Sequence, residues 1–219
     1  MKNDISKWVN LKFCSLNSID FADKYRQKLS LYVFLVLFFF NINFVNAENI
    51  RHAYFAGGCF WCMEESFEKA SGVREVISGY SGGNLPNPTY KEVTYNNTGH
   101  FETVKIIYDQ NKISFERLLN LYWTNIDPFD AVGQFCDKGL SYRTVVFYQN
   151  NLQKQLTEKS IKKIEKKFNG KKVVTFVRKF EKFYPAENYH QDYYQESFIN
   201  YLMYKKACGR EEQLKRIWQ

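Results

Sequence analysis

The sequence predicts a single α+β domain in which helices pack on a mixed β-sheet, and three observations support this class. Segments with strand-like alternation and segments with helical periodicity follow one another from residue 52 onward. No internal repeat or low-complexity linker interrupts this succession. The chain has 219 residues, of which 45% are hydrophobic. That is ample for one packed core and short for two domains.

The expected strands are residues 52–56, 73–80, 100–108, 142–149 and 172–180. Between the first two, Gly57 and Gly58 turn the chain into a helix over about residues 59–70, which Ser71-Gly72 ends. A β-α-β-β-α-β-α-β succession of this kind is typical of an α+β domain.

The later helices follow the same rules. Ser114 is expected to cap a helix that ends at Asp127-Pro128. A Lys-rich helix lies between the last two strands, and its lysines share the helix with apolar residues, so a solvated face explains the formal charge of +8. The pattern of a nucleic-acid-binding module is missing, and we therefore expect no nucleic-acid partner. After Pro185, a Tyr-rich helical segment leads into a polar C-terminal tail.

Residues 1–47 are predicted to lie outside this domain, which spans residues 48–219. Basic residues from Lys24 to Lys28 precede an apolar run at 31–40, and small residues such as Ala47 follow it. This order is typical of a secretory signal peptide. The apolar run is shorter than the roughly 20 residues of a spanning helix, although the long basic region leaves an uncleaved N-terminal anchor open. Either alternative predicts an extracytoplasmic location, the periplasm if the source is bacterial.

Four cysteines remain in the domain, and two of them, Cys59 and Cys62, form a C-x-x-C pair at the expected helix start. The positive end of the helix dipole is expected to lower the pKa of Cys59 and make it a nucleophile. Four interpretations stay open: two buried structural thiols, a thioredoxin-like dithiol, a structural zinc site, and one nucleophile with a resolving cysteine. Zinc is disfavoured because Cys136, Cys208 and His100 stand singly. We expect no metal or organic cofactor.

Glu102 is the candidate proton donor. In the strand 100–108 its side chain shares a face with Val104, Ile106 and Tyr108. A carboxyl group on an apolar face is partly desolvated, which raises its pKa and keeps it protonated near neutrality. Alternatively, Glu102 lies at the wet end of the strand or pairs with a cation. A protonated acid beside a thiolate would provide a nucleophile and a general acid.

Six motifs in this order resemble the A-type peptide-methionine sulfoxide reductases. They cover nearly the whole domain: GCFWCMEESF (58–67), GYSGG (79–83), PNPTYKEV (86–93), TGHFETVKIIYD (98–109), QFCDKGLSYRTVVFY (134–148) and FYPAENYHQDYY (183–194). The resemblance implies a two-layer α+β sandwich around a mixed β-sheet with a ferredoxin-like core. It also implies reduction of the S epimer of methionine sulfoxide, free or in oxidised proteins, to methionine.

By this resemblance, Cys59 is the nucleophile and Glu102 the acid that protonates the sulfoxide oxygen. Tyr80 and Tyr142 match phenols that hydrogen-bond this oxygen, although each alone would also suit an ordinary core tyrosine. The remaining matches line the substrate site: Phe60 and Trp61 as the wall for the methyl group, with Asp137, Glu187 and His190 around it.

Three cysteines are candidates for the resolving step. Cys208 is the first choice, because a polar tail could swing to Cys59; Cys62 and then Cys136 follow. The resulting disulfide would be recycled by thioredoxin or a thioredoxin-like reductant, and a monomer is expected. The alternatives are a general thiol–disulfide oxidoreductase built on C-x-x-C and a non-enzymatic sulfoxide-peptide or zinc-binding module.

Overall fold

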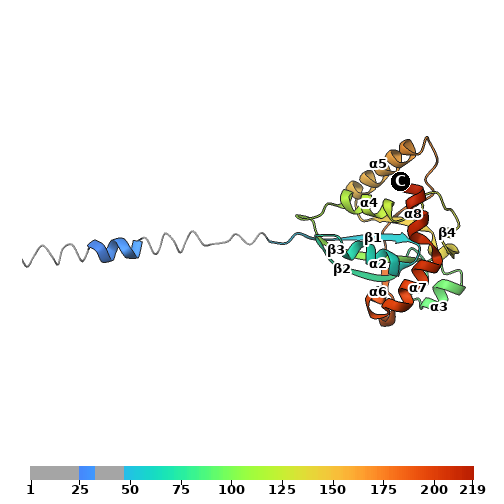
Figure 1. Cartoon of the computed structure of the whole chain (residues 1–219), viewed down its shortest axis with the longest axis horizontal. Coiled ribbons are helices and arrows are strands. Elements are labelled where there is room, and N and C mark those ends of the chain that lie inside the picture. Colours follow the sequence, from blue (N-terminus) through green and yellow to red (C-terminus); the bar gives the residue numbers. More distant parts are fainter. Residues whose placement is uncertain (1–24, 33–46) are drawn as a thin grey trace, which may run out of the picture. The chain divides into compact units, whose positions relative to one another are not determined.

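The computed structural model describes residues 25–32 and 47–219 (Figure 1). The chain divides into two units, Met1–Ala47 and Glu48–Gln219. In the first unit, residues 25–32 form a helix. Most of the predicted apolar leader, at 33–46, lies outside the described residues, so the signal peptide or anchor stays a prediction. Among the helices that the structure describes, none combines the length and apolar character needed to span a bilayer.

The second unit is built on a six-stranded sheet with the order β7-β6-β1-β3-β2-β8. Only β6 and β7 are parallel, and the other pairs are antiparallel, which confirms the predicted mixed sheet. The strands are β1 (Ile50–Gly57), β2 (Val73–Ser81), β3 (Phe101–Asp109), β6 (Thr144–Tyr148), β7 (Phe176–Lys179) and β8 (Phe183–Pro185). A small separate hairpin is formed by β4 (Gly133–Gln134) and β5 (Asp137–Lys138).

Helices alternate with these strands, as expected for an α+β fold (Figure 1). The α-helices are α2 (Phe60–Glu68), α3 (Tyr90–Tyr95), α4 (Phe115–Thr124), α5 (Asn151–Lys167), α6 (Tyr193–Glu196), α7 (Phe198–Cys208) and α8 (Arg210–Trp218). Two short 3-10 helices, η1 (Leu140–Tyr142) and η2 (Asn188–His190), complete the described elements of this unit.

The two faces of the sheet bury different clusters. On one face, β-strand residues such as Phe55, Val104 and Ile106 pack against Phe67 of α2 and Leu118 of α4 in the main core. The opposite face carries a smaller aromatic cluster that includes Tyr54, Phe101 and Phe147. Because β-strand side chains alternate between faces, Glu102 is directed into the main core and Phe101 away from it. This confirms the prediction that the Glu102 side chain lies on the apolar, core-facing side of its strand.

The structure departs from the sequence prediction mainly in the last quarter of the chain. The predicted strand at 172–180 is regular only at Phe176–Lys179. The predicted polar tail is instead the helix α8, which packs on the domain: Arg210 is 3% exposed, and the Trp218 indole N–H donates to the Ile126 carbonyl at 3.0 Å. Arg210 and Trp218 anchor the two ends of α8, and the rest of this helix is largely charged and exposed. Because most of its residues are polar, composition alone indicated a tail rather than a packed helix.

Candidate active site

Two glycines place Cys59 at the junction between β1 and α2. A Cβ atom on Gly57 would lie 2.6 Å from the Met63 sulfur, and one on Gly58 would lie 2.6 Å from Gln134. Gly58 also has a φ of +81°, which favours glycine. Only this close backbone approach lets the strand turn directly into the helix. Cys59 is the residue before the first helical turn, and its carbonyl accepts from the Cys62 N–H at 3.2 Å.

Glu102 meets the same helix start from the neighbouring strand β3. The Phe60 N–H donates to Glu102 Oε2 at 3.0 Å, so the carboxyl group satisfies one of the free N–H groups at the helix N-terminus. Glu102 is 2% exposed, and burial raises its pKa to about 8 despite this hydrogen bond. At neutral pH, Glu102 therefore carries a proton that it can donate.

Cys59 and Glu102 line a small cavity of about 50 Å³. Its wall consists of aromatic rings together with one further carboxyl group: Phe60, Trp61, Tyr90, Asp137, Tyr142 and Tyr204. Burial raises the pKa of Tyr90 and of Tyr142, so both phenols stay protonated and able to donate. The Tyr204 hydroxyl donates to Asp137 Oδ2 at 2.5 Å. A cavity of this size and lining suits a small group with one apolar and one hydrogen-bond-accepting end.

Tyr80 is one of the predicted site residues that do not line this cavity. It faces Glu102 across the β2–β3 pair, but its hydroxyl donates to Glu187 Oε2 at 2.9 Å. The other Glu187 oxygen accepts from the Tyr90 N–H at 2.9 Å. Tyr90 thus lines the cavity and Tyr80 does not, while Glu187 joins Tyr80 to the start of α3, which carries Tyr90. Sequence reasoning missed Tyr90, although the quoted PNPTYKEV motif contained it.

His190 lies behind the aromatic wall and outside the cavity. It is 2% exposed, and its ring centroid lies 4.4 Å from that of Tyr90 and 5.0 Å from that of Phe60. Burial lowers its pKa, so it is neutral at pH 7. On the outer side, Tyr193 stacks on Trp61 with 3.9 Å between centroids. These contacts fix the rings of Phe60 and Trp61.

The two thiols of the C-x-x-C pair have pKa values shifted in opposite directions. Both are buried, at 4% and 3% exposure. The hydrogen bond from Cys59, together with the charge of Arg210 and the Tyr201 hydroxyl, lowers the pKa of Cys62 to about 7. Burial, followed by this hydrogen bond to Cys62, raises the pKa of Cys59. The expected low pKa of Cys59 is therefore not found in the resting site, because burial outweighs the helix terminus and the negative charge rests on Cys62.

The other two cysteines form a disulfide, Cys136–Cys208, between residues 72 positions apart. Cys136 is exposed in the turn of the β4–β5 hairpin, and Cys208 is the buried last residue of α7. With Asp137 they are near enough to one another to hold a metal ion, but the disulfide consumes both thiolates. Cys208 is thereby held by Cys136 and by the packing of α8, which corrects the prediction of a mobile tail free to reach Cys59.

A buried cysteine pair beside a protonated carboxyl group and hydrogen-bonding phenols defines a thiol-dependent oxidoreductase with a proton donor at the reacting centre. Comparison with known proteins gives the family. The sequence model of peptide methionine sulfoxide reductase matches residues 51–219. The chain is 47% identical over 173 residues to a peptide methionine sulfoxide reductase of Listeria innocua, covering 78% of this chain and 98% of that protein.

Another relative and two solved structures agree with this match. The Bacillus licheniformis peptide methionine sulfoxide reductase is 47% identical, with 78% of this chain and 96% of the relative covered. The reduced form of Mxr1 from Saccharomyces cerevisiae superposes with a TM-score of 0.63 at 26% identity, covering 71% and 90% of the two chains. Methionine sulfoxide reductase A of Corynebacterium diphtheriae gives 0.62 at 25% identity, covering 69% and 76%.

The chain belongs to the peptide methionine sulfoxide reductase family. It reduces methionine sulfoxide to methionine, as the resemblance of its six motifs implied.

Proposed function

We propose that Cys59 attacks the sulfoxide sulfur while Glu102 protonates the sulfoxide oxygen. The observation that carries this assignment is the buried Glu102 carboxyl group, protonated below a pKa of about 8 and lining the same 50 Å³ cavity as Cys59. A sulfoxide sulfur is a weak electrophile and its oxygen leaves poorly, so proton donation during attack accelerates the step by about 10²–10⁴-fold. The products are methionine and a sulfenic acid on Cys59.

Cys62 receives the proton that Cys59 must lose. In the resting pair the charge lies on Cys62, and as Cys59 attacks, its proton passes along their shared hydrogen bond. Tyr90 and Tyr142 donate hydrogen bonds to the sulfoxide oxygen, and Phe60 and Trp61 hold the methyl group. Asp137 lines the cavity and accepts from Tyr204. Glu187 and His190 act through other residues: Glu187 holds Tyr90 and Tyr80, and His190 supports the rings.

Cys62 is also the resolving cysteine. Its thiol condenses with the sulfenic acid of Cys59, forming a Cys59–Cys62 disulfide and water. Cys62 lies one helical turn from Cys59, whereas Cys208 is bonded to Cys136. Thioredoxin or a thioredoxin-like protein then reduces the new disulfide in two thiol–disulfide exchanges.

The proposal also covers the substrate, the oligomeric state and the location of the protein. The substrates are the S epimer of methionine sulfoxide in oxidised proteins and as the free amino acid, and the protein acts as a monomer. The basic and then apolar order of residues 24–47 supports a signal peptide or anchor and an extracytoplasmic, periplasm-like location.

The test is epimer-resolved turnover of a sulfoxide-containing peptide by the full chain with dithiothreitol. We expect the S epimer to be consumed and the R epimer to remain. Loss of both epimers at equal rates would overturn the proposed geometry, in which cavity shape selects one epimer.

A general thiol–disulfide oxidoreductase activity is the second candidate, favoured by the low pKa of Cys62 within a C-x-x-C pair. It predicts reduction of the insulin disulfides at a rate that Glu102→Gln leaves unchanged. The small cavity over Cys59 opposes it, because a protein disulfide does not fit into about 50 Å³.

A further inference from the structure

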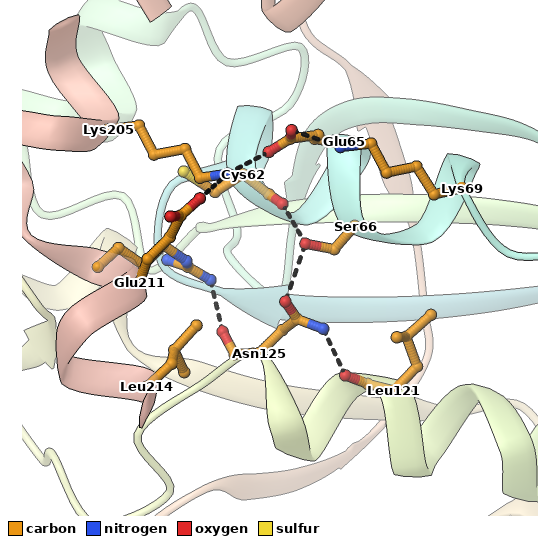
Figure 2. Close-up of a pocket in the computed structure, with 10 residues that line it drawn as sticks. Cys62, Glu65, Ser66, Lys69, Leu121, Asn125, Lys205, Glu211 and Leu214 are labelled. Atoms are coloured by element: carbon orange, nitrogen blue, oxygen red, sulfur yellow. Dashed lines mark hydrogen bonds and ion pairs between the residues drawn. The ribbon is translucent and has the colours of Figure 1, made fainter. Parts of the chain in front are cut away.

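A second cavity lies behind Cys62. It has a volume of about 320 Å³ between α2, α4 and α8, and Cys62 and Leu214 belong to its lining (Figure 2). Lys69 and Lys205 stand on the same lining. Cys59 lines the 50 Å³ substrate cavity, whereas Cys62 lines this larger one. The two cysteines therefore line different cavities.

This arrangement decides which sulfur of a Cys59–Cys62 disulfide an external thiol can reach. Exchange requires a thiolate to attack one sulfur in line with the bond that breaks, so access selects the sulfur. The aromatic wall leaves room for little more than a methyl sulfoxide beside Cys59. The cavity at Cys62 is about six times larger and has the volume of a small peptide.

The charge around this cavity also suits a thiolate. At its rim, Lys205 pairs with Glu65 at 2.9 Å and with Glu211 at 2.8 Å, so these charges largely cancel. At its base, Arg210 donates to the Asn125 carbonyl at 2.6 Å and to the Gly57 carbonyl at 3.4 Å. Within the described part of the chain, Arg210 forms no ion pair with a carboxylate. An arginine remains charged in proteins, so its positive charge, which also acts on the Asp137 carboxyl group, favours a thiolate at Cys62.

We propose that the reducing thiol enters through this second cavity and attacks Cys62, so that substrate and reductant use opposite sides of one disulfide. This proposal rests on the proposed function, which supplies the Cys59–Cys62 disulfide. The entering thiolate bonds to Cys62 Sγ, the Cys59–Cys62 bond breaks, and Cys59 leaves with the electron pair. A second thiol attacks the reductant's sulfur in this mixed disulfide, and Cys62 leaves as a thiolate beside Arg210. Two thiols are oxidised to one disulfide, and two cysteines are reduced.

The first test traps the mixed disulfide. The full chain is oxidised with one equivalent of sulfoxide and then treated with a thioredoxin that lacks its second active-site cysteine or, in a parallel arm, with glutathione. We expect peptide mapping to find the adduct on Cys62 in the arm whose thiol fits the cavity. An adduct in both arms assigns the cavity to protein and small thiols alike. An adduct on Cys59, or on Cys136 alone, would overturn the proposal.

The second test fills the cavity with Leu214→Trp and uses Leu152→Trp as the control, because Leu152 is exposed on α5 away from both cavities. We expect Leu214→Trp to lower the recycling rate at least tenfold more than it lowers the first turnover, which needs no reductant. Equal changes in both rates would contradict the proposed route. Failure to form methionine or the Cys59–Cys62 disulfide in the unsubstituted chain would instead refute the proposed function.

Discussion

The two cysteine pairs of this chain lie in opposite kinds of environment. Cys59 and Cys62 stand one helical turn apart, are both buried, and remain free thiols. Cys136 and Cys208 are 72 positions apart, and their disulfide ties the turn of the β4–β5 hairpin to the end of α7. The local pair is set against a proton donor and a buried cation, whereas the distant pair joins two parts of the fold. Environment, rather than spacing in the sequence, separates the reactive pair from the linking one.

The largest expected effect is the difference in first-turnover rate between variants of Cys59 and of Cys62. Cys59→Ser should lower methionine formation by about 10⁴-fold or more, because the nucleophile is lost. Cys62→Ser should keep the first turnover within about tenfold, because solvent can accept the Cys59 proton that Cys62 otherwise receives. Its sulfenic acid should accumulate and be trapped by dimedone. Rapid-quench measurement of methionine checks both variants, and equal losses would show that the two thiols act as one unit.

Glu102→Gln should lower turnover by about 10²–10⁴-fold with little change in substrate binding, because the acid acts in the transition state. Burial raises the pKa of Glu102 to about 8, so the active protonated form is lost as pH rises through this value. The unsubstituted enzyme should therefore show falling kcat above about pH 8. The Gln variant should lack this limb in a kcat–pH profile, and its persistence would assign the limb to another group.

Tyr90→Phe and Tyr80→Phe compare a residue of the cavity with one behind it. A hydrogen bond to the sulfoxide oxygen is worth about 1–1.5 kcal/mol, so Tyr90→Phe should lower kcat by up to about tenfold. Tyr80→Phe should leave kcat within about threefold and lower the free energy of unfolding by about 1 kcal/mol, because Glu187 loses a donor. Steady-state kinetics and urea unfolding check the pair, and a reversed order would restore Tyr80 as the contact to the oxygen.

The double variant Cys136→Ser with Cys208→Ser should show the smallest effect on catalysis. We expect the first turnover to stay within about threefold. The free energy of unfolding should fall by about 2–4 kcal/mol, as for other disulfides that close long loops. Thermal unfolding under non-reducing conditions measures the loss, and the unsubstituted protein in excess reductant is the control. A tenfold slower first turnover would place this pair in the chemical step.

Much of the site could be predicted from the sequence where the signal is local. Alternation along β3 placed Glu102 on the core face, and the glycine pair placed Cys59 at a helix start. The motif order identified the family. Contacts between distant segments leave no pattern in the sequence. How α7 and α8 pack on the domain decides the disulfide partner of Cys208 and the burial of Arg210. The position of α3 decides that Tyr90, rather than Tyr80, lines the cavity. Tyr80 comes just before a turn-rich loop and Tyr90 ends it, and only tertiary contacts distinguish their roles.

Which cysteine of the Cys59–Cys62 pair carries the negative charge also depends on tertiary contacts. The helix start alone favours a low pKa for Cys59, but burial and the approach of Arg210 from α8 place the charge on Cys62. Arg210 lies 148 positions after Cys62 in the sequence, and its charge thereby lowers the pKa of a thiol in the first helix of the domain.

The central claim is that the local pair performs the redox chemistry while the distant pair stays bonded. Peptide mapping of the full chain after one equivalent of sulfoxide, without reductant and after rapid alkylation, tests it most directly. The account predicts one equivalent of methionine, a new Cys59–Cys62 disulfide and an unchanged Cys136–Cys208 disulfide. A dominant Cys59–Cys208 bridge, with Cys136 released as a free thiol, would contradict it.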